Sequence, residues 1–136
     1  MLTLNLPFPV SVNAMYANKG KRRIKSKRYF EWRIEALKCL DSVRLNTLID
    51  YPIMLQIAFI APDRRKRDLD NHAKAIQDVL TGNIIEDDSQ IKLLCMWWDQ
   101  LSPSKAYAGA QVIISPLHSP DGQSFLESLQ NARAAA

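Results

Sequence analysis

The sequence predicts an α+β fold, a single domain in the order β-α-β-α-β-β with a mixed sheet and its helices on one face. The length of 136 residues favours one domain, because a second independent core would leave each half marginally stable. Two segments space their apolar residues as helices do, and four others show strand patterns. Two helices placed among four strands in that order indicate a sheet covered on one side.

The composition excludes several classes of protein. At 47% hydrophobic and 24% charged residues, the chain is neither collagen-like nor disordered, and no apolar run is long enough to span a bilayer. The first ten residues are mixed and contain two prolines, unlike a signal peptide, so we expect a cytoplasmic protein without a membrane partner. Cys39 and Cys95 lie in separate apolar segments, which favours reduced, buried thiols.

The first part of the chain contains a strand, a long loop and a helix. Residues 2–6 alternate apolar and polar side chains, which predicts a short strand. Residues 7–25 are rich in proline, asparagine and lysine without a sustained period, so we expect a loop. Ser26 is placed to cap a helix that runs to about Asn46. The expected apolar face of this helix consists of Phe30, Ile34, Leu37 and Leu40.

The middle of the chain predicts a core strand followed by a second helix. Apolar side chains occupy alternate positions in residues 51–61, between two prolines. Asp68 can cap the second helix, and Gly82 supplies its end. The expected apolar face of that helix consists of Leu69, Ala73, Ile76 and Leu80.

Two strands and a tail complete the chain. Residues 91–99 and 106–115 have strand patterns, and the turn-rich residues 100–105 between them favour an antiparallel arrangement. The composition changes after Pro116. Residues 118–136 are polar and then alanine-rich, so we expect a tail that is either helical from about Gln123 or disordered.

The charges are concentrated in short runs. The net charge is only +4, but eight of the 18 lysines and arginines lie in residues 19–33. Four more form a continuous block, Arg64, Arg65, Lys66 and Arg67. Seven of the 14 acidic residues lie in residues 63–88, directly against that block. Cations suited to an anionic partner therefore stand beside a cluster of carboxylates.

The acids beside the basic block suit a metal ion. Asp68 and Asp70 are hard oxygen donors with few soft neighbours, and such donors suit Mg²⁺ or Mn²⁺. Residues two apart point the same way in an extended segment, so both carboxylates can converge on one ion. Lys74 follows one helical turn beyond Asp70, within reach of the same place.

A structural explanation of these residues has comparable weight. Asp68 can be a helix N-cap, Asp70 an acid favoured by the helix dipole, and the basic block a solvated run. Asp87 with Gln90 fits a capping box. His72 has no cysteine or histidine nearby, which favours packing or a phosphate contact over metal binding. From the residues alone both explanations remain open.

The sequence around these residues resembles the RusA family of Holliday junction resolvases, which prophages often carry. The resemblance rests on Arg-Arg-Lys-Arg-Asp-Leu-Asp-Asn at positions 64–71, followed by Lys74 and by Asp-Asp-Ser-Gln at positions 87–90. It extends to Leu-Pro-Phe-Pro at positions 6–9 and covers most of the chain to about Ser115. We therefore expect an endonuclease domain over residues 1–117 and a separate tail over residues 118–136.

The resemblance implies a Mg²⁺-dependent endodeoxyribonuclease that binds four-way DNA junctions as a homodimer and makes symmetric paired incisions. Asp68, Asp70 and Asp88 match the metal-binding catalytic aspartates of the family, and Lys74 matches its essential lysine. Mn²⁺ is a possible substitute for Mg²⁺. Asp87 and Asn71 are candidate accessory residues. The expected DNA contacts are Arg64, Arg65, Lys66 and Arg67 together with Lys21, Arg22 and Arg23 of the basic loop.

Two other functions remain open from the sequence. A non-catalytic DNA-binding module would use the basic runs to hold the DNA backbone and the acids to cap helices. An enzyme of phosphoryl transfer or RNA cleavage could use the same ions. The last has less support, because the chain has only four glycines and no glycine-rich phosphate loop.

Overall fold

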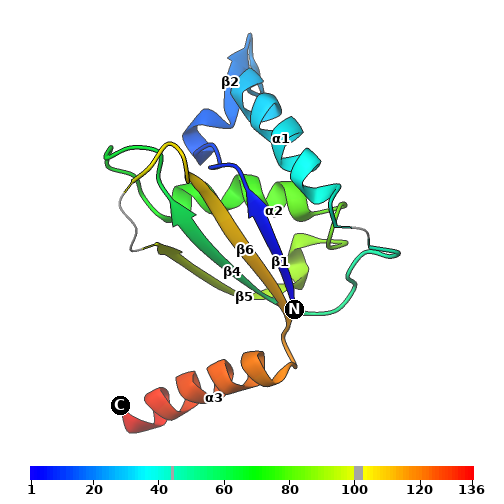
Figure 1. The fold of residues 1–136 in the computed structure, drawn as a ribbon, viewed down its shortest axis with the longest axis vertical. Coiled ribbons are helices and arrows are strands. Elements are labelled where there is room, and N and C mark those ends of the chain that lie inside the picture. The colour runs from blue at the N-terminus through cyan, green and yellow to red at the C-terminus, as the bar shows by residue number, and fades with distance from the viewer. Residues whose placement is uncertain (44, 100–102) are drawn as a thin grey trace.

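The protein is built on a mixed sheet of four strands, as expected (Figure 1). The structure is a computed structural model that describes residues 1–43, 45–99 and 103–136. The strand order is β1-β6-β4-β5, and β4 runs antiparallel to β6 and parallel to β5. The strands are β1 Leu2–Leu6, β4 Ile53–Ile60, β5 Ile91–Trp98 and β6 Gly109–Pro116. The prediction of a single α+β domain with a mixed sheet is confirmed.

The pairing of the last two strands differs from a simple hairpin. β5 and β6 run in opposite directions, as expected, but β4 lies between them. β4 is one of the two inner strands, and it is apolar on both faces. Ile57 and Phe59 are fully buried on one face, and Met54 and Ala58 are buried on the other. The connection from β4 to the parallel β5 is a crossover that contains a helix. Residues 100–102 of the expected turn lie outside the described residues.

Helix α1, Lys27–Leu40, begins where the sequence predicts and ends earlier. The Ser26 hydroxyl accepts a hydrogen bond from the Tyr29 backbone nitrogen at 3.1 Å, so the expected N-cap is confirmed. The expected apolar face is confirmed at Leu40, which is buried, but it is wrong at Phe30 and Ile34, which are 51% and 55% exposed. Leu37 is partly buried against the core. The buried residues are Tyr29, Trp32, Ala36 and Leu40. Both sides of the helix carry apolar residues, and the bulkier pair Tyr29 and Trp32 packs inward.

Helix α2, Ala73–Leu80, is shorter than expected because a 3₁₀ helix, Asp70–His72, precedes it. Asp68 is therefore not the N-cap; Leu69 precedes the 3₁₀ helix and makes no side-chain cap hydrogen bond. Ala73, Ile76 and Leu80 are buried as predicted. Gly82 adopts a φ of 78°, the left-handed conformation that glycine accommodates at the end of a helix.

The expected loop over residues 7–25 contains regular structure. A 3₁₀ helix, Val12–Ala14, leads into an antiparallel hairpin of β2, Tyr16–Lys19, and β3, Arg22–Lys25. Gly20 has a φ of 61° at the first position of the two-residue turn. The strands were missed because most of their side chains are charged or polar and exposed, so no apolar alternation marks them.

The core lies between the sheet and the helices α1 and α2, which share one face of the sheet (Figure 1). Sheet residues such as Leu55 and Val112 belong to the same buried cluster as Trp32 and Ile76 of the helices. Neither α1 nor α2 covers the opposite face (Figure 1). Cys39 and Cys95 are free thiols as predicted, although each is only partly buried.

Helix α3, Pro120–Ala135, leads away from the sheet (Figure 1). It begins three residues before the expected start at Gln123, because the Ser119 hydroxyl caps it by accepting from the Gly122 backbone nitrogen at 3.3 Å. Gly122 is its one buried residue. Among the described residues, no helix has both the length and the apolar character needed to cross a membrane.

Candidate active site and nucleic-acid surface

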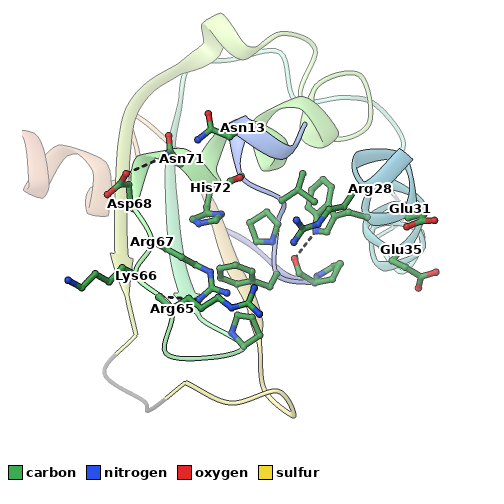
Figure 2. Close-up of a pocket in the computed structure, with 17 residues that line it drawn as sticks. Asn13, Arg28, Glu31, Glu35, Arg65, Lys66, Arg67, Asp68, Asn71 and His72 are labelled. Atoms are coloured by element: carbon green, nitrogen blue, oxygen red, sulfur yellow. Dashed lines mark hydrogen bonds between the residues drawn. The ribbon is translucent and has the colours of Figure 1, made fainter. Parts of the chain in front are cut away.

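Asp68 and Asp70 lie in the segment that connects β4 to α2, where the chain reverses direction. Both side chains are exposed. The Asn71 side-chain nitrogen donates to Asp68 Oδ2 at 3.4 Å, and Figure 2 shows the two groups facing each other at the edge of a cavity. Asn71 therefore orients one candidate ligand, a role that agrees with its expected place beside the site.

Asp88 lies near the start of α2, where its Oδ2 is 3.8 Å from the Lys74 ammonium. It opens a 3₁₀ helix, Asp88–Gln90, that precedes β5, and its neighbour Asp87 forms a capping box with Gln90. The capping box that the sequence suggested for Asp87 and Gln90 is therefore present. The Gln90 side chain also donates to the carbonyls of Ile49 and Tyr51 at 2.8 and 3.0 Å. These bonds fix the acidic turn and leave the Asp88 carboxylate exposed.

Lys74 lies between two carboxylates. Its ammonium is 2.8 Å from Asp78 Oδ1 and 3.8 Å from Asp88 Oδ2. The hydrogen bond to Asp78 raises the pKa of Lys74, with the charge of Asp88 acting in the same direction. Lys74 is therefore a fixed cation beside Asp88 at neutral pH. No contact between Lys74 and Asp70 was found in the described residues, although the sequence places them one turn apart.

A second lysine shares Asp78. Lys25 of β3 donates to Asp78 Oδ2 at 3.1 Å and to the Tyr16 hydroxyl at 3.3 Å. Partial burial acts to raise the pKa of Asp78, but hydrogen bonds from Lys74 and Lys25 outweigh it and lower the pKa below its usual value. Asp78 is therefore a carboxylate held ionised between two ammonium groups.

The candidate metal ligands have suitable chemistry but are not gathered. Asp68, Asp70 and Asp88 offer the hard carboxylate oxygens that Mg²⁺ prefers, and all three are exposed. Within residues 1–43, 45–99 and 103–136, no three histidine, cysteine or acidic side chains lie close enough together to hold one metal ion.

The basic block divides into an anchored and an exposed part. Arg67 is only 16% exposed, donates to Asp63 Oδ1 at 2.8 Å, and lies over the Phe8 ring at 5.4 Å. The hydrogen bond from Arg67 lowers the pKa of Asp63 to about 2. Lys66, by contrast, is exposed at the rim of the cavity (Figure 2). Arg67 thus fixes the loop, and its exposed neighbours are the better placed to contact DNA.

A cavity of about 700 Å³ runs from Asp68 between the basic block and α1 (Figure 2). Arg28, Arg65 and Lys66 contribute cations to its lining, whereas Glu31 and Glu35 of α1 contribute acids. Of the candidate catalytic residues, Asp68 lines this cavity, whereas Asp70, Lys74 and Asp88 are not part of its lining. A cavity that connects cations to Asp68 can accept a phosphate-bearing strand.

An aromatic cluster supports the floor of this region. The His72 ring lies 5.1 Å from Phe8, 6.0 Å from Trp98 and 6.3 Å from Phe59, measured between ring centroids. His72 is 5% exposed. Of the packing and phosphate-contact roles expected for His72, this burial favours packing. The cluster joins β4, β5 and the start of α2 beneath Arg67.

His72 should make the stability of the fold depend on pH. Burial lowers the pKa of His72, opposed by a backbone hydrogen bond to Pro9 and reinforced by the Arg67 charge. The unfolded chain, with an ordinary histidine pKa of about 6.5, therefore binds more protons, and the free energy of unfolding should fall as pH drops below that value. We expect His72→Leu to weaken this dependence in denaturant titrations between about pH 7 and 5. An unchanged dependence, equal to that of the exposed His118→Leu control, would contradict this assignment.

The β2–β3 hairpin carries the other basic run. Lys21, Arg22 and Arg23 are exposed, and the Arg23 guanidinium lies over the Tyr16 ring at 4.3 Å. Lys25 lies over the same ring at 4.5 Å. The hairpin thus exposes these cations to solvent, while Lys25 at the end of β3 pairs with Asp78 of α2.

Sequence reasoning missed Asp78 and Lys25 as parts of the site. The spacing of Lys74 and Asp78 is a signal for an ion pair, since residues four apart share a helix face. Lys25 left no such signal, because 53 positions separate it from Asp78.

Exposed carboxylates, a lysine held near one of them and a cavity lined by several cations supply groups that can act on a phosphodiester. The family model of endodeoxyribonuclease RusA matches residues 7–114. The chain belongs to the RusA family of endodeoxyribonucleases, which confirms the resemblance seen in the sequence and the prediction of a nuclease.

Relatives in this family come from bacteria and phage. The crossover junction endodeoxyribonuclease RusA of Aquifex aeolicus (strain VF5) is 37% identical over 87 residues, or 63% of this chain and 68% of the relative. The protein of that name from Escherichia coli (strain K12) is 32% identical over 91 residues, or 65% and 75%. The one from Enterobacteria phage 82 is 33% identical over 90 residues, or 65% and 74%.

Proposed function

We propose that this protein is a Mg²⁺-dependent endonuclease that resolves four-way DNA junctions by paired incisions in recombination and repair. The observation that carries the proposal is the position of Lys74. It lies at the start of α2, shortly after Asp68 and Asp70 in the sequence, and its ammonium is 3.8 Å from Asp88 Oδ2. Its relatives are named crossover junction endodeoxyribonucleases. We place its action in the cytoplasm, where such DNA substrates arise.

Asp68, Asp70 and Asp88 are the residues that would hold the metal ion. When bound, Mg²⁺ or Mn²⁺ supplies a water of lowered pKa and offsets the negative charge that builds up on the phosphate. These carboxylates are exposed, so the phosphate and the ion can reach them together. Asn71 holds Asp68 in place through the 3.4 Å hydrogen bond.

The protein's own cations complete the chemistry. The Lys74 ammonium can donate to a non-bridging phosphate oxygen and stabilise the charge of the transition state. Arg64, Arg65 and Lys66 would bind phosphates on either side of the scissile bond, which positions the strand without reading its sequence. Arg67 contributes indirectly, because it holds this loop against Asp63 and Phe8.

A homodimer suits a junction that has two equivalent scissile strands. The sheet face that lacks α1 and α2 offers apolar surface for such contact. Trp97 of β5 is 41% exposed on this face, while its neighbour Trp98 packs toward Phe59. We propose that two copies associate so that each active site meets one of the two strands.

The test is cleavage of three labelled substrates: a synthetic four-way junction, a linear duplex of the same sequence and a replication fork. Each is incubated with and without Mg²⁺. We expect incision of the junction in Mg²⁺ and none in a chelator. Binding without incision in any divalent metal would replace the proposal with the non-catalytic DNA-binding module.

The hairpin should supply a measurable share of the salt dependence of binding. Lys21→Gln with Arg22→Gln is expected to flatten the slope of log K against log salt by up to about 1.8, or roughly 0.9 for each phosphate that the variant no longer neutralises. Electrophoretic or fluorescence titration of the junction at several salt concentrations measures this slope. Arg133→Gln on α3 is the matched control and should leave the slope unchanged. Equal slopes for the hairpin variant and the control would remove the hairpin from the interface.

A further inference from the structure

Four charged groups form a continuous chain across the site. Lys25 contacts Asp78 at 3.1 Å, Asp78 contacts Lys74 at 2.8 Å, and Lys74 approaches Asp88 at 3.8 Å. This series of ion pairs joins three separate elements: β3 of the basic hairpin, α2, and the turn before β5. It therefore connects a DNA-facing hairpin to the lysine and to one carboxylate of the candidate active site.

We propose that Asp78 is a positioning residue that fixes the Lys74 ammonium beside Asp88 and ties the basic hairpin to it through Lys25. This inference rests on the proposed function, since it assigns Lys74 its task there. Asp78 itself would touch neither DNA nor metal. It would act through the two lysines that it binds.

Geometry favours Asp78 over Asp88 as the anchor of Lys74. The contact with Asp78 is a hydrogen-bonded ion pair four residues along one helix, and its carboxylate is 21% exposed. The distance from Lys74 to Asp88 is 3.8 Å, compared with 2.8 Å to Asp78, and the Asp88 side chain is 49% exposed. The more sheltered pair is the less screened by water, so it sets the position of the ammonium.

The two oxygens of Asp78 are divided between the two lysines. Oδ1 accepts from Lys74 and Oδ2 from Lys25. Lys25 is further enclosed by Tyr16, which accepts from it, and by the Tyr29 ring at 4.6 Å. Removing the charge of Asp78 leaves two ammonium groups that repel each other. Among the described residues, Asp88 is then the remaining carboxylate near Lys74. Lys74 would then shift toward Asp88 and away from its place at the phosphate.

Asp78→Asn keeps the shape of the side chain and removes its charge. We expect the single-turnover rate on a saturating junction to fall by about 10- to 100-fold, the usual cost of misplacing a catalytic group by about 1 Å. Junction binding in a chelator should weaken several-fold at most, because the hairpin loses its anchor on Asp78 while the variant gains one unit of positive charge. Asp78→Glu keeps the charge on a longer arm and should give an intermediate rate. Asp41→Asn, an exposed acid just after α1, is the matched control and should behave as the wild type.

Lys25→Met tests the ion pair between Lys25 and Asp78. Lys74 keeps its 2.8 Å partner in this variant, so the saturating rate should stay within about 3-fold of the wild type. The hairpin loses its anchor, so the dissociation constant of the junction should rise several-fold. Lys38→Met, which breaks a 2.9 Å pair with Glu35 on α1, is the control lysine. A loss of the saturating rate in Lys25→Met as large as that in Asp78→Asn would overturn the assignment.

A readout without metal or DNA separates positioning from folding. In ¹H–¹⁵N spectra of lysine ammonium groups at low temperature, Lys74 and Lys25 should give slowly exchanging signals in the wild type. We expect Asp78→Asn to lose both signals while the unfolding midpoint changes little. If Asp78→Asn does not fold, Asp78→Glu carries the test: a rate equal to the wild type would overturn the inference. A wild-type protein that cuts no junction would instead refute the proposed function, while the ammonium signals still report on Asp78.

Discussion

Asp70→Asn is expected to abolish junction cleavage in Mg²⁺ while binding stays intact or becomes tighter. The substitution removes one of the hard oxygen donors assigned to the metal, and it also removes a negative charge that repels phosphate. Loss of a group that stabilises the transition state costs about 100- to 1,000-fold, and we expect at least the upper end for a metal ligand. Single-turnover cleavage and electrophoretic binding in a chelator measure the two effects separately.

Asp41→Asn is the control for this experiment, because it removes one exposed acid that is not among the residues assigned to the site. Its binding should tighten only slightly and its cleavage should remain. Residual cleavage by Asp70→Asn at a rate near that of the wild type would remove Asp70 from the metal site. A combined loss of binding and cleavage would indicate damage to the fold.

Phe59→Ala is expected to cost about 3 to 5 kcal/mol of the free energy of unfolding. Phe59 is fully buried at the end of the inner strand β4, where its ring meets Phe8, His72 and Trp98. Against a total stability of about 5 to 15 kcal/mol for a domain, this loss threatens the folded state. Denaturant titration followed by circular dichroism measures it.

Phe30→Ala makes the same chemical change on the exposed side of α1. Phe30 is 51% exposed and has an edge contact with Tyr29 at 5.7 Å. We expect a loss of no more than about 1 kcal/mol, in line with substitutions at exposed positions. The comparison also tests the phase of α1. Equal losses for the two variants would mean that the helix buries Phe30 after all.

Much of the fold follows from local patterns. The strand at residues 2–6 and the buried face of α2 follow from periodicity, and Ser26 marks the start of α1 by its capping preference. The β2–β3 hairpin lacks that information, since its side chains lie in solvent and carry charge instead of apolar alternation. The position of β4 between β5 and β6 depends on which strands pair across the sheet, which no local pattern specifies.

The site was only partly predictable for the same reason. The sequence indicated Asp68, Asp70 and Lys74 by their spacing, and the family resemblance added Asp88. Local geometry decided against Asp68 as a helix cap, since a 3₁₀ helix begins at Asp70. The partnership of Lys25 with Asp78 arises only when the hairpin folds over α2, so it could not be seen along the chain. The role of Asp63 was not predicted either. Asp63 pairs with Arg67, so fewer of the four cations at positions 64–67 are free to bind DNA than the sequence alone suggests.

Mapping the incisions on all four strands of an end-labelled four-way junction tests the central claim most directly. In Mg²⁺ we expect two nicks at symmetric positions, in the two strands of like polarity, and products that a ligase can seal. The linear duplex of the same sequence should remain intact. Cuts in one strand alone, or cuts spread through the duplex arms, would contradict the assignment of a junction-resolving endonuclease.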